Sequence, residues 1–280
     1  MLQSALDHYR AEQRITIAGL IALRRSRFDT LDALVRAALG YQLLAAREAS
    51  AAAPLMLAEQ GINVSAEATT RPAGLAGWAS DGRSLRGLLD YTRDPSVTGP
   101  MFDRIVSTQL QDVARQAAAI EMAVRPQVTS YARILNPPSC SRCAILAGRI
   151  YRKSAGFRRH PRCDCRHVPT TSSEAGGLTT DPRAYFDSLD QPEQDRIFTK
   201  AGAEAIRLGA NMGKVVNARR GMAAAQSGRI AAQGAFGQRL FTTVEAAPRG
   251  AVRLMPESIL QVAEGDAEAI RLLRAHGYIT

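Results

Sequence analysis

The feature that most constrains this chain is a cluster of cysteines and histidines between residues 140 and 167. All four cysteines and two of the four histidines of the 280-residue chain lie in this segment. The first cysteine pair has the spacing C-x2-C and the second has the spacing C-x-C, so two short stretches can each present thiolates to one ion. Zinc is the ion that such a tetrahedral set usually binds. The sequence therefore predicts a small knuckle that is fixed by Zn2+.

The segment offers six candidate ligands for about four places around the ion. His160 can replace Cys163 or Cys165, because two thiolates separated by one residue reach a single ion only through a strained loop. His167 is the weaker candidate and is expected to be exposed to solvent. The predicted metal ligands are Cys140, Cys143, His160, Cys163 and Cys165.

Two other interpretations of these cysteines stay open. Two disulfides are typical of secreted proteins, but residues 1–10 contain charged side chains from the seventh position on, and no apolar signal segment follows. A reducing compartment, and with it a metal site, is therefore the favoured expectation. A catalytic pair such as Cys140 with His160 explains one cysteine and leaves three without a role.

Charge is concentrated in two blocks. The chain has a formal net charge of +10, and residues 140–167 contain eight basic residues against one acidic residue, while residues 200–255 contain nine against two. Clustered positive charge attracts polyanions without reading a base sequence. A solvated basic surface without a nucleic-acid role is the alternative. The predicted nucleic-acid surface consists of Arg158, Arg159, Arg162, Arg166, Lys214, Arg219 and Arg220.

The spacing of apolar residues predicts a mainly helical chain. Steps of three and four residues indicate two helices or one long bent pair within residues 1–60, with a new start near Thr30 and a close formed by Pro54 and the Gly61 region. Arg24, Arg25 and Arg27 are expected on the solvated side of the first helix. The same spacing predicts helices over residues 101–125, over 190–209 with Asp190 as N-cap, and over 267–276.

Residues that favour strands flank the cysteines. The runs 128–135 and 150–153 are rich in β-branched and aromatic residues. The predicted fold class is therefore mainly α with a small α+β zinc-knuckle domain. Five segments are expected, namely a helical domain over 1–125, the knuckle over 126–169, a linker and helix over 170–221, a flexible basic glycine-rich segment over 222–252 and a C-terminal helix over 253–280. No apolar run reaches the roughly 18 residues that a membrane-spanning helix needs.

The motifs resemble those of the phage minor head proteins named after the F protein of phage Mu. The likeness lies in Cys140-Ser-Arg-Cys143-Ala-Ile-Leu-Ala-Gly, in His160-Pro-Arg-Cys163-Asp-Cys165, and in the later runs from Tyr185 and Arg253. These later runs are similar to the actinobacteriophage branch of that family. The resemblance covers roughly residues 85–280, and Arg166-His167 after the second cysteine pair departs from the pattern.

This resemblance implies a structural protein of the virion, present at low copy number inside the capsid. Its expected partners are the portal protein, the major capsid protein and packaged double-stranded DNA, without a membrane. A capsid maturation protease that processes scaffold or capsid protein is the competing function. A serine protease needs a histidine base beside the serine, and only His8 and His276 lie outside the cysteine segment. The sequence therefore favours a structural role over an enzyme.

Overall fold

The computed structural model describes residues 2–68, 70–79, 82–135, 139–155, 165–171, 177–178, 181–225, 241–243 and 252–280. The chain forms two compact units. Unit 1 consists of Met1–Pro138 and Ala147–Thr180, and unit 2 consists of Ser139–Leu146 and Asp181–Thr280. Each unit is described by itself.

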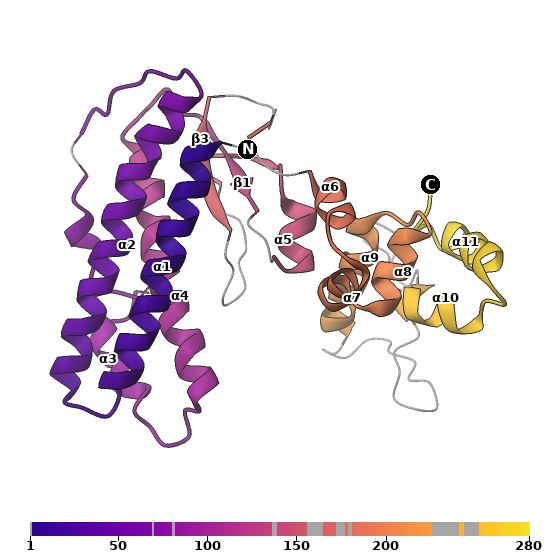
Figure 1. Ribbon diagram of the computed structural model, residues 1–280, viewed down its shortest axis with the longest axis horizontal. Helices are drawn as coiled ribbons and strands as arrows, with labels where there is room; N and C mark the ends of the chain where they lie inside the picture. Colours follow the sequence, from indigo (N-terminus) through magenta and orange to yellow (C-terminus); the bar gives the residue numbers. More distant parts are fainter. Residues whose placement is uncertain are drawn as a thin grey trace. The chain divides into compact units, whose positions relative to one another are not determined.

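Unit 1 contains a bundle of three long helices (Figure 1). These are α1 (Gln3–Ser26), α2 (Leu31–Glu59) and α4 (Gly99–Ala123), with the short α3 (Leu85–Tyr91) and a 3-10 turn (Pro72–Leu75) between α2 and α4. The predicted pair of helices in residues 1–60 is confirmed, since Thr30 caps α2 by accepting a hydrogen bond from the Ala33 amide at 3.2 Å.

The predicted close of this segment is confirmed at Gly61, which has a φ of 72° just after α2, but it is wrong for Pro54. Pro54 lies inside α2, which continues to Glu59. The turns around Pro54 carry Ala52, Ala53, Met56 and Leu57, and all four side chains are buried. Tertiary packing of that face offsets the lost backbone hydrogen bond, which the sequence around a proline does not reveal.

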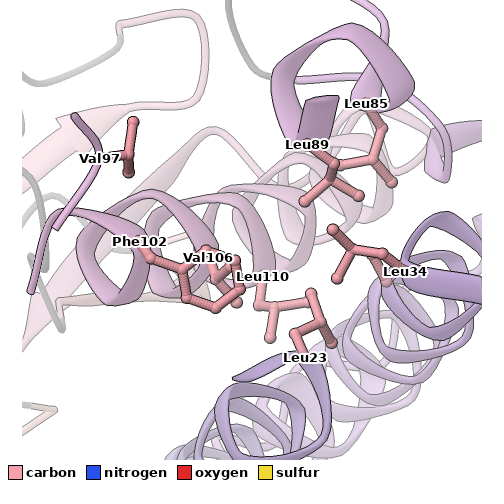
Figure 2. Close-up of a cluster of buried hydrophobic side chains, with 9 residues drawn as sticks. Leu23, Leu34, Leu85, Leu89, Val97, Phe102, Val106 and Leu110 are labelled. Carbon is pink, nitrogen blue, oxygen red and sulfur yellow. The ribbon is translucent and has the colours of Figure 1, made fainter. Parts of the chain in front are cut away.

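The three helices meet in a core of leucines and aromatic side chains. Figure 2 shows Leu23 of α1, Leu34 of α2 and Leu110 of α4 pointing toward one another. The approach of α1 is close, because a Cβ atom added to Gly19 would lie 2.6 Å from the Leu110 Cδ1 atom. A side chain at this position would require Leu110 to shift and would lie 3.2 Å from the Tyr41 ring, so the glycine permits the close approach.

Arg27 corrects one expectation about the first helix. Arg24 and Arg25 are exposed, but Arg27 is buried. Its guanidinium donates to the carbonyl oxygens of Thr92 and Val97, and it lies 4.9 Å from the ring centroid of Phe102. A cation that satisfies two carbonyls of a neighbouring loop can be buried at low cost, so this arginine does not face solvent.

A three-stranded antiparallel sheet completes unit 1. It has the order β2–β1–β3, with β1 at Ser130–Ile134, β2 at Ile150–Arg152 and β3 at Arg166–Thr170. Ala132 pairs with both Ile150 and Val168. Ala132, Ile134 and Val168 form one apolar cluster with Ala5 of α1 and with Ala52 and Met56 of α2. The sheet therefore packs against the helical bundle.

Unit 2 is made of short helices and a two-stranded sheet. The helices are α5 (Ser141–Leu146), α6 (Pro182–Asp187), α7 (Gln191–Phe198), α8 (Lys200–Arg207), α9 (Met212–Ala225), α10 (Pro256–Val262) and α11 (Asp266–Ala275). The strands are β4 (Phe241–Thr243) and β5 (Val252–Leu254).

The single helix expected over residues 190–209 is two helices. Asp190 caps α7 as predicted, accepting from the Glu193 amide at 2.8 Å. Thr199 then breaks the helix with a φ of 70°, and its hydroxyl accepts from the Gly202 amide at 3.3 Å to cap α8. A threonine in a left-handed backbone conformation is uncommon, so the apolar spacing alone conceals this break.

The predicted fold class is confirmed, because helices dominate and a small antiparallel sheet lies beside the cysteine segment. The five predicted segments stay a prediction. Most of the glycine-rich segment 222–252 lies outside the described residues. Within the described part of the chain, no helix is long and apolar enough to cross a membrane.

Candidate metal centre and the buried arginines of unit 1

The predicted metal ligands fall into three groups. Cys140 and Cys143 belong to unit 2, and Cys165 belongs to unit 1. His160 and Cys163 lie outside the described residues. Among the residues that are described, no three histidine, cysteine or acidic side chains form a metal-binding group. The zinc site therefore stays a prediction.

The first cysteine pair is shaped by α5. Cys140 precedes the helix and is exposed, whereas Cys143 lies within it and is buried. The backbone N–H of Cys143 donates to the Cys140 sulfur at 3.4 Å. The backbone before the pair is held by Tyr185, whose hydroxyl accepts from the Ser139 amide at 3.0 Å. A sulfur that accepts a backbone N–H is suited to carry negative charge, as a metal ligand must.

The disulfide interpretation finds no support among the described cysteines. Cys140, Cys143 and Cys165 form no disulfide with one another.

Cys165 lies in the most cationic part of the interior of unit 1. The residue is buried, and its sulfur accepts a hydrogen bond from the Arg133 Nη2 atom at 2.9 Å. Its carbonyl oxygen accepts from Arg115 Nε at 3.1 Å and from Arg166 Nη1 at 3.3 Å. Guanidinium donors stabilise a thiolate by charge-assisted hydrogen bonding. This cysteine is therefore held from α4, β1 and β3 at once.

Arg166 corrects the predicted nucleic-acid surface. Only 3% of this residue is exposed, so it cannot contact a polyanion at the surface. Its Nη2 atom lies 3.9 Å from the Glu12 Oε2 atom, and its guanidinium lies 5.6 Å from the centroid of the Tyr9 ring. Arg166 begins β3 and points toward α1, because residues 166 and 168 share the sheet face that packs on the helices.

Glu12 is the fully buried carboxyl group of this cluster. Its two oxygens accept no hydrogen bond from the described residues, and burial raises the pKa of Glu12 to about 7. The Arg166 charge acts in the opposite direction and lowers that pKa. The pKa of His8, also on α1, shifts in the opposite direction. Burial lowers it, and this effect outweighs that of Glu48, which lies 3.5 Å from the Nδ1 atom and raises the pKa. A buried carboxyl and a buried imidazole both favour their neutral forms.

His167 does not project freely into solvent as expected. It is half-buried, and its ring lies 4.4 Å from the ring of Tyr131, which also stacks on Tyr151 at 5.4 Å. His167 pairs with Arg133 across the sheet. The imidazole therefore packs on the sheet face that carries Arg133, the arginine that reaches Cys165.

The other predicted basic residues are only partly described. Arg158, Arg159 and Arg162 lie outside the described residues, and the side chains of Arg219 and Arg220 on α9 do as well. Lys214 is half-buried on α9. The structure adds two arginines to the candidates, because Arg149 precedes the short β2, Arg152 is its last residue, and both are exposed. Their place in the basic block was visible in the sequence, but their exposure was not.

One family model, described as VG15 protein, matches residues 3–191. This range is more than half of the chain and includes the helical bundle, the three-stranded sheet and all four cysteines. The chain belongs to the VG15 protein family. VG15 is a family of viral gene proteins, and membership indicates a phage protein.

Two further comparisons gave no relative of this VG15 protein. Neither a curated protein nor a solved structure matches the chain.

The buried Glu12 of this VG15 protein predicts a stability that falls with rising pH. Below pH 4.5 the carboxyl is neutral in both the folded and the unfolded state. As the pH rises from 4.5 to about 7, the carboxyl ionises in the unfolded state but stays neutral in the folded state, so the free energy of unfolding falls. Glu12→Gln removes the ionisable group, so the variant is expected to be more stable than the wild type at pH 8 by at most about 3 kcal/mol. Urea unfolding at pH 5, 6, 7 and 8 measures the difference, which should shrink toward pH 5. Asp90→Asn, at an exposed acid, is the control, and an unchanged gap across this pH range contradicts the assignment.

Proposed function

We propose that this VG15 protein is a minor head protein of a tailed phage, located inside the capsid near the portal. The observation that carries the proposal is the family match over residues 3–191, which contains the motif shared with Mu F-like minor head proteins, Cys140-x2-Cys143 followed by Cys163-x-Cys165. Portal protein and major capsid protein are the proposed protein partners.

The test of this role is the composition of the finished particle. A structural head protein is expected in purified virions at a few copies per particle and should not turn over another capsid protein. A maturation protease, the competing function, should cleave scaffold or capsid protein and lose that cleavage when one serine or cysteine is replaced. Quantitative mass spectrometry of purified virions, with an assay on scaffold and capsid proteins, separates the two. Absence from virions contradicts the proposal.

The cysteine segment is proposed to bind one Zn2+ that stabilises the chain around it. The ligands would be four of the five candidates Cys140, Cys143, His160, Cys163 and Cys165. The N–H donors on the sulfurs of Cys140 and Cys165 support thiolates at these positions, and a structural zinc adds stability only when its ligands are deprotonated. The role of the metal is structural, because four protein ligands leave no open position.

Cys140→Ser and Cys143→Ser are each expected to lose zinc and to unfold the segment around residues 136–169. The physical reason is that a serine hydroxyl is a poor zinc ligand beside a thiolate. Metal analysis of the wild-type protein should give about one zinc per chain. Ser141→Ala, between the two cysteines, is the control that should retain the metal. A wild-type protein without zinc, or full zinc content in both cysteine variants, would overturn the site.

Packaged DNA is the proposed polyanion. Arg149 and Arg152 are exposed beside β2, in the block with eight basic residues against one acidic residue. Phosphate contacts by such side chains are independent of base sequence, which suits a protein that meets packaged DNA of any sequence.

Double-stranded DNA binding should weaken steeply as salt rises, because each phosphate contact releases a counterion. Arg152→Ala is expected to lower the affinity for all sequences alike and to reduce the slope of log affinity against log salt by about 1. Fluorescence anisotropy with a labelled duplex at several salt concentrations measures both. The control is Arg196→Ala, which removes an exposed arginine that pairs with Glu193 at 3.1 Å. An affinity that does not depend on salt excludes a phosphate-based interaction.

A further inference from the structure

We propose that the outward face of α1 is a docking surface for an acidic amphipathic helix of another protein. Three large apolar side chains of this face are open to solvent, with Ile17 51% exposed, Ile21 45% and Phe28 75%. Ile17 and Ile21 are four residues apart, and Phe28 follows Ile17 by eleven residues, just beyond the end of the helix. Steps of four and eleven residues place side chains on one face of a helix.

This apolar face is not needed for the core of unit 1. The side of α1 that packs on α2 and α4 is formed by other residues, including Ala5, Glu12, Thr16, Gly19 and Leu23. Figure 2 shows Leu23 directed into the bundle core. Single exposed apolar residues are ordinary, but three on one helical face form a stripe that marks an interaction surface.

Cations border the stripe. Arg10, Arg14, Arg24 and Arg25 are all exposed. Two of these arginines are paired with carboxylates, since Arg24 bonds Asp103 of α4 with Nε 2.7 Å from the Oδ1 atom and Arg10 lies 3.6 Å from Asp7. The acidic residues of this exposed face, Asp7 and Asp29, lie near its two ends. Arg14 and Arg25 therefore carry the positive charge of the face that can attract a partner with acidic side chains beside an apolar seam.

A second copy of the chain fits this face poorly. If two copies of α1 pair in antiparallel fashion around Ile17 and Ile21, Arg14 of one copy lies opposite Arg24 of the other. In a parallel pair with the isoleucines in register, each arginine lies opposite the same arginine of the other chain. Like charges that face each other across an interface oppose association. Neither arrangement therefore places a carboxylate of α1 opposite Arg14 or Arg25.

DNA is also disfavoured as the occupant of this face. Phosphate groups would satisfy the arginines, but they leave Ile17, Ile21 and Phe28 without an apolar partner. A helix with one apolar stripe between two rows of acidic residues satisfies both features, since amphipathic helices dock by apolar side chains spaced three and four residues apart.

The experiment uses the full-length protein and a labelled synthetic peptide of about 21 residues, six helical turns. The peptide has leucines at helical spacing and glutamates on both flanks, and the control peptide has the same leucines with lysines on the flanks. Binding is measured by fluorescence anisotropy. The wild type is expected to bind the glutamate peptide at least about tenfold more tightly than the lysine peptide.

Two sets of variants test the two features of the face. Ile17→Ser with Ile21→Ser removes the apolar contacts, and Arg14→Glu with Arg25→Glu reverses the charge. Each double variant is expected to weaken glutamate-peptide binding at least about tenfold, with an unchanged circular dichroism spectrum because all four side chains are exposed. Leu55→Ser, at a side chain of α2 that is 61% exposed, is the matched control and should bind as the wild type does.

Three outcomes overturn the proposal. The first is a peptide result without discrimination. Either the wild type binds both peptides equally, or the isoleucine variant binds the glutamate peptide as tightly as the wild type does. The second is a wild-type dimer in sedimentation that the isoleucine variant abolishes, which would assign the face to a second copy. The third is a loss of duplex-DNA binding in the isoleucine variant, which would assign it to DNA.

Discussion

The contact between Cys165 and three buried arginines is the interaction on which unit 1 depends most. Arg115, Arg133 and Arg166 come from α4, β1 and β3, and each donates a hydrogen bond to an atom of Cys165. Burying guanidinium groups is costly unless their donors are used, and Arg115 and Arg166 also lie beside the carboxyl groups of Asp112 and Glu12. The sheet is thereby tied to the bundle by polar contacts as well as by apolar ones.

The same contacts explain why sequence reasoning succeeded with the cysteine segment only in part. The strands around the cysteines could be predicted, because β-branched residues are local signals, whereas metal binding by the cysteines stays a prediction. The burial of Arg166 is not local. It depends on Glu12, which lies more than 150 residues earlier in the chain and 3.9 Å away in space. An arginine that follows a cysteine in a basic block looks like surface charge until the fold is known.

Helices show the same division between local and tertiary causes. The sequence predicted three local features correctly, because each depends on neighbouring residues. These are the helix cap at Thr30, the helix cap at Asp190 and the helix that ends before Pro126. The continuation of α2 through Pro54 depends on packing, and the break at Thr199 depends on a backbone conformation that few threonines adopt. Neither leaves a mark in hydrophobic spacing. For the candidate site, metal binding by the cysteines stays a prediction, and their distribution over two units could not be read from their spacing.

Arg27 shows how one side chain can join two turns. It leaves the end of α1, and its guanidinium bonds two carbonyl oxygens in the stretch between α3 and α4. Opening of that stretch would strand a buried cation, so local fraying at this end of the bundle is expensive. Amide hydrogens near residues 92–97 should accordingly exchange with solvent on the same slow timescale as those in the helical core, although no regular helix or strand covers this stretch.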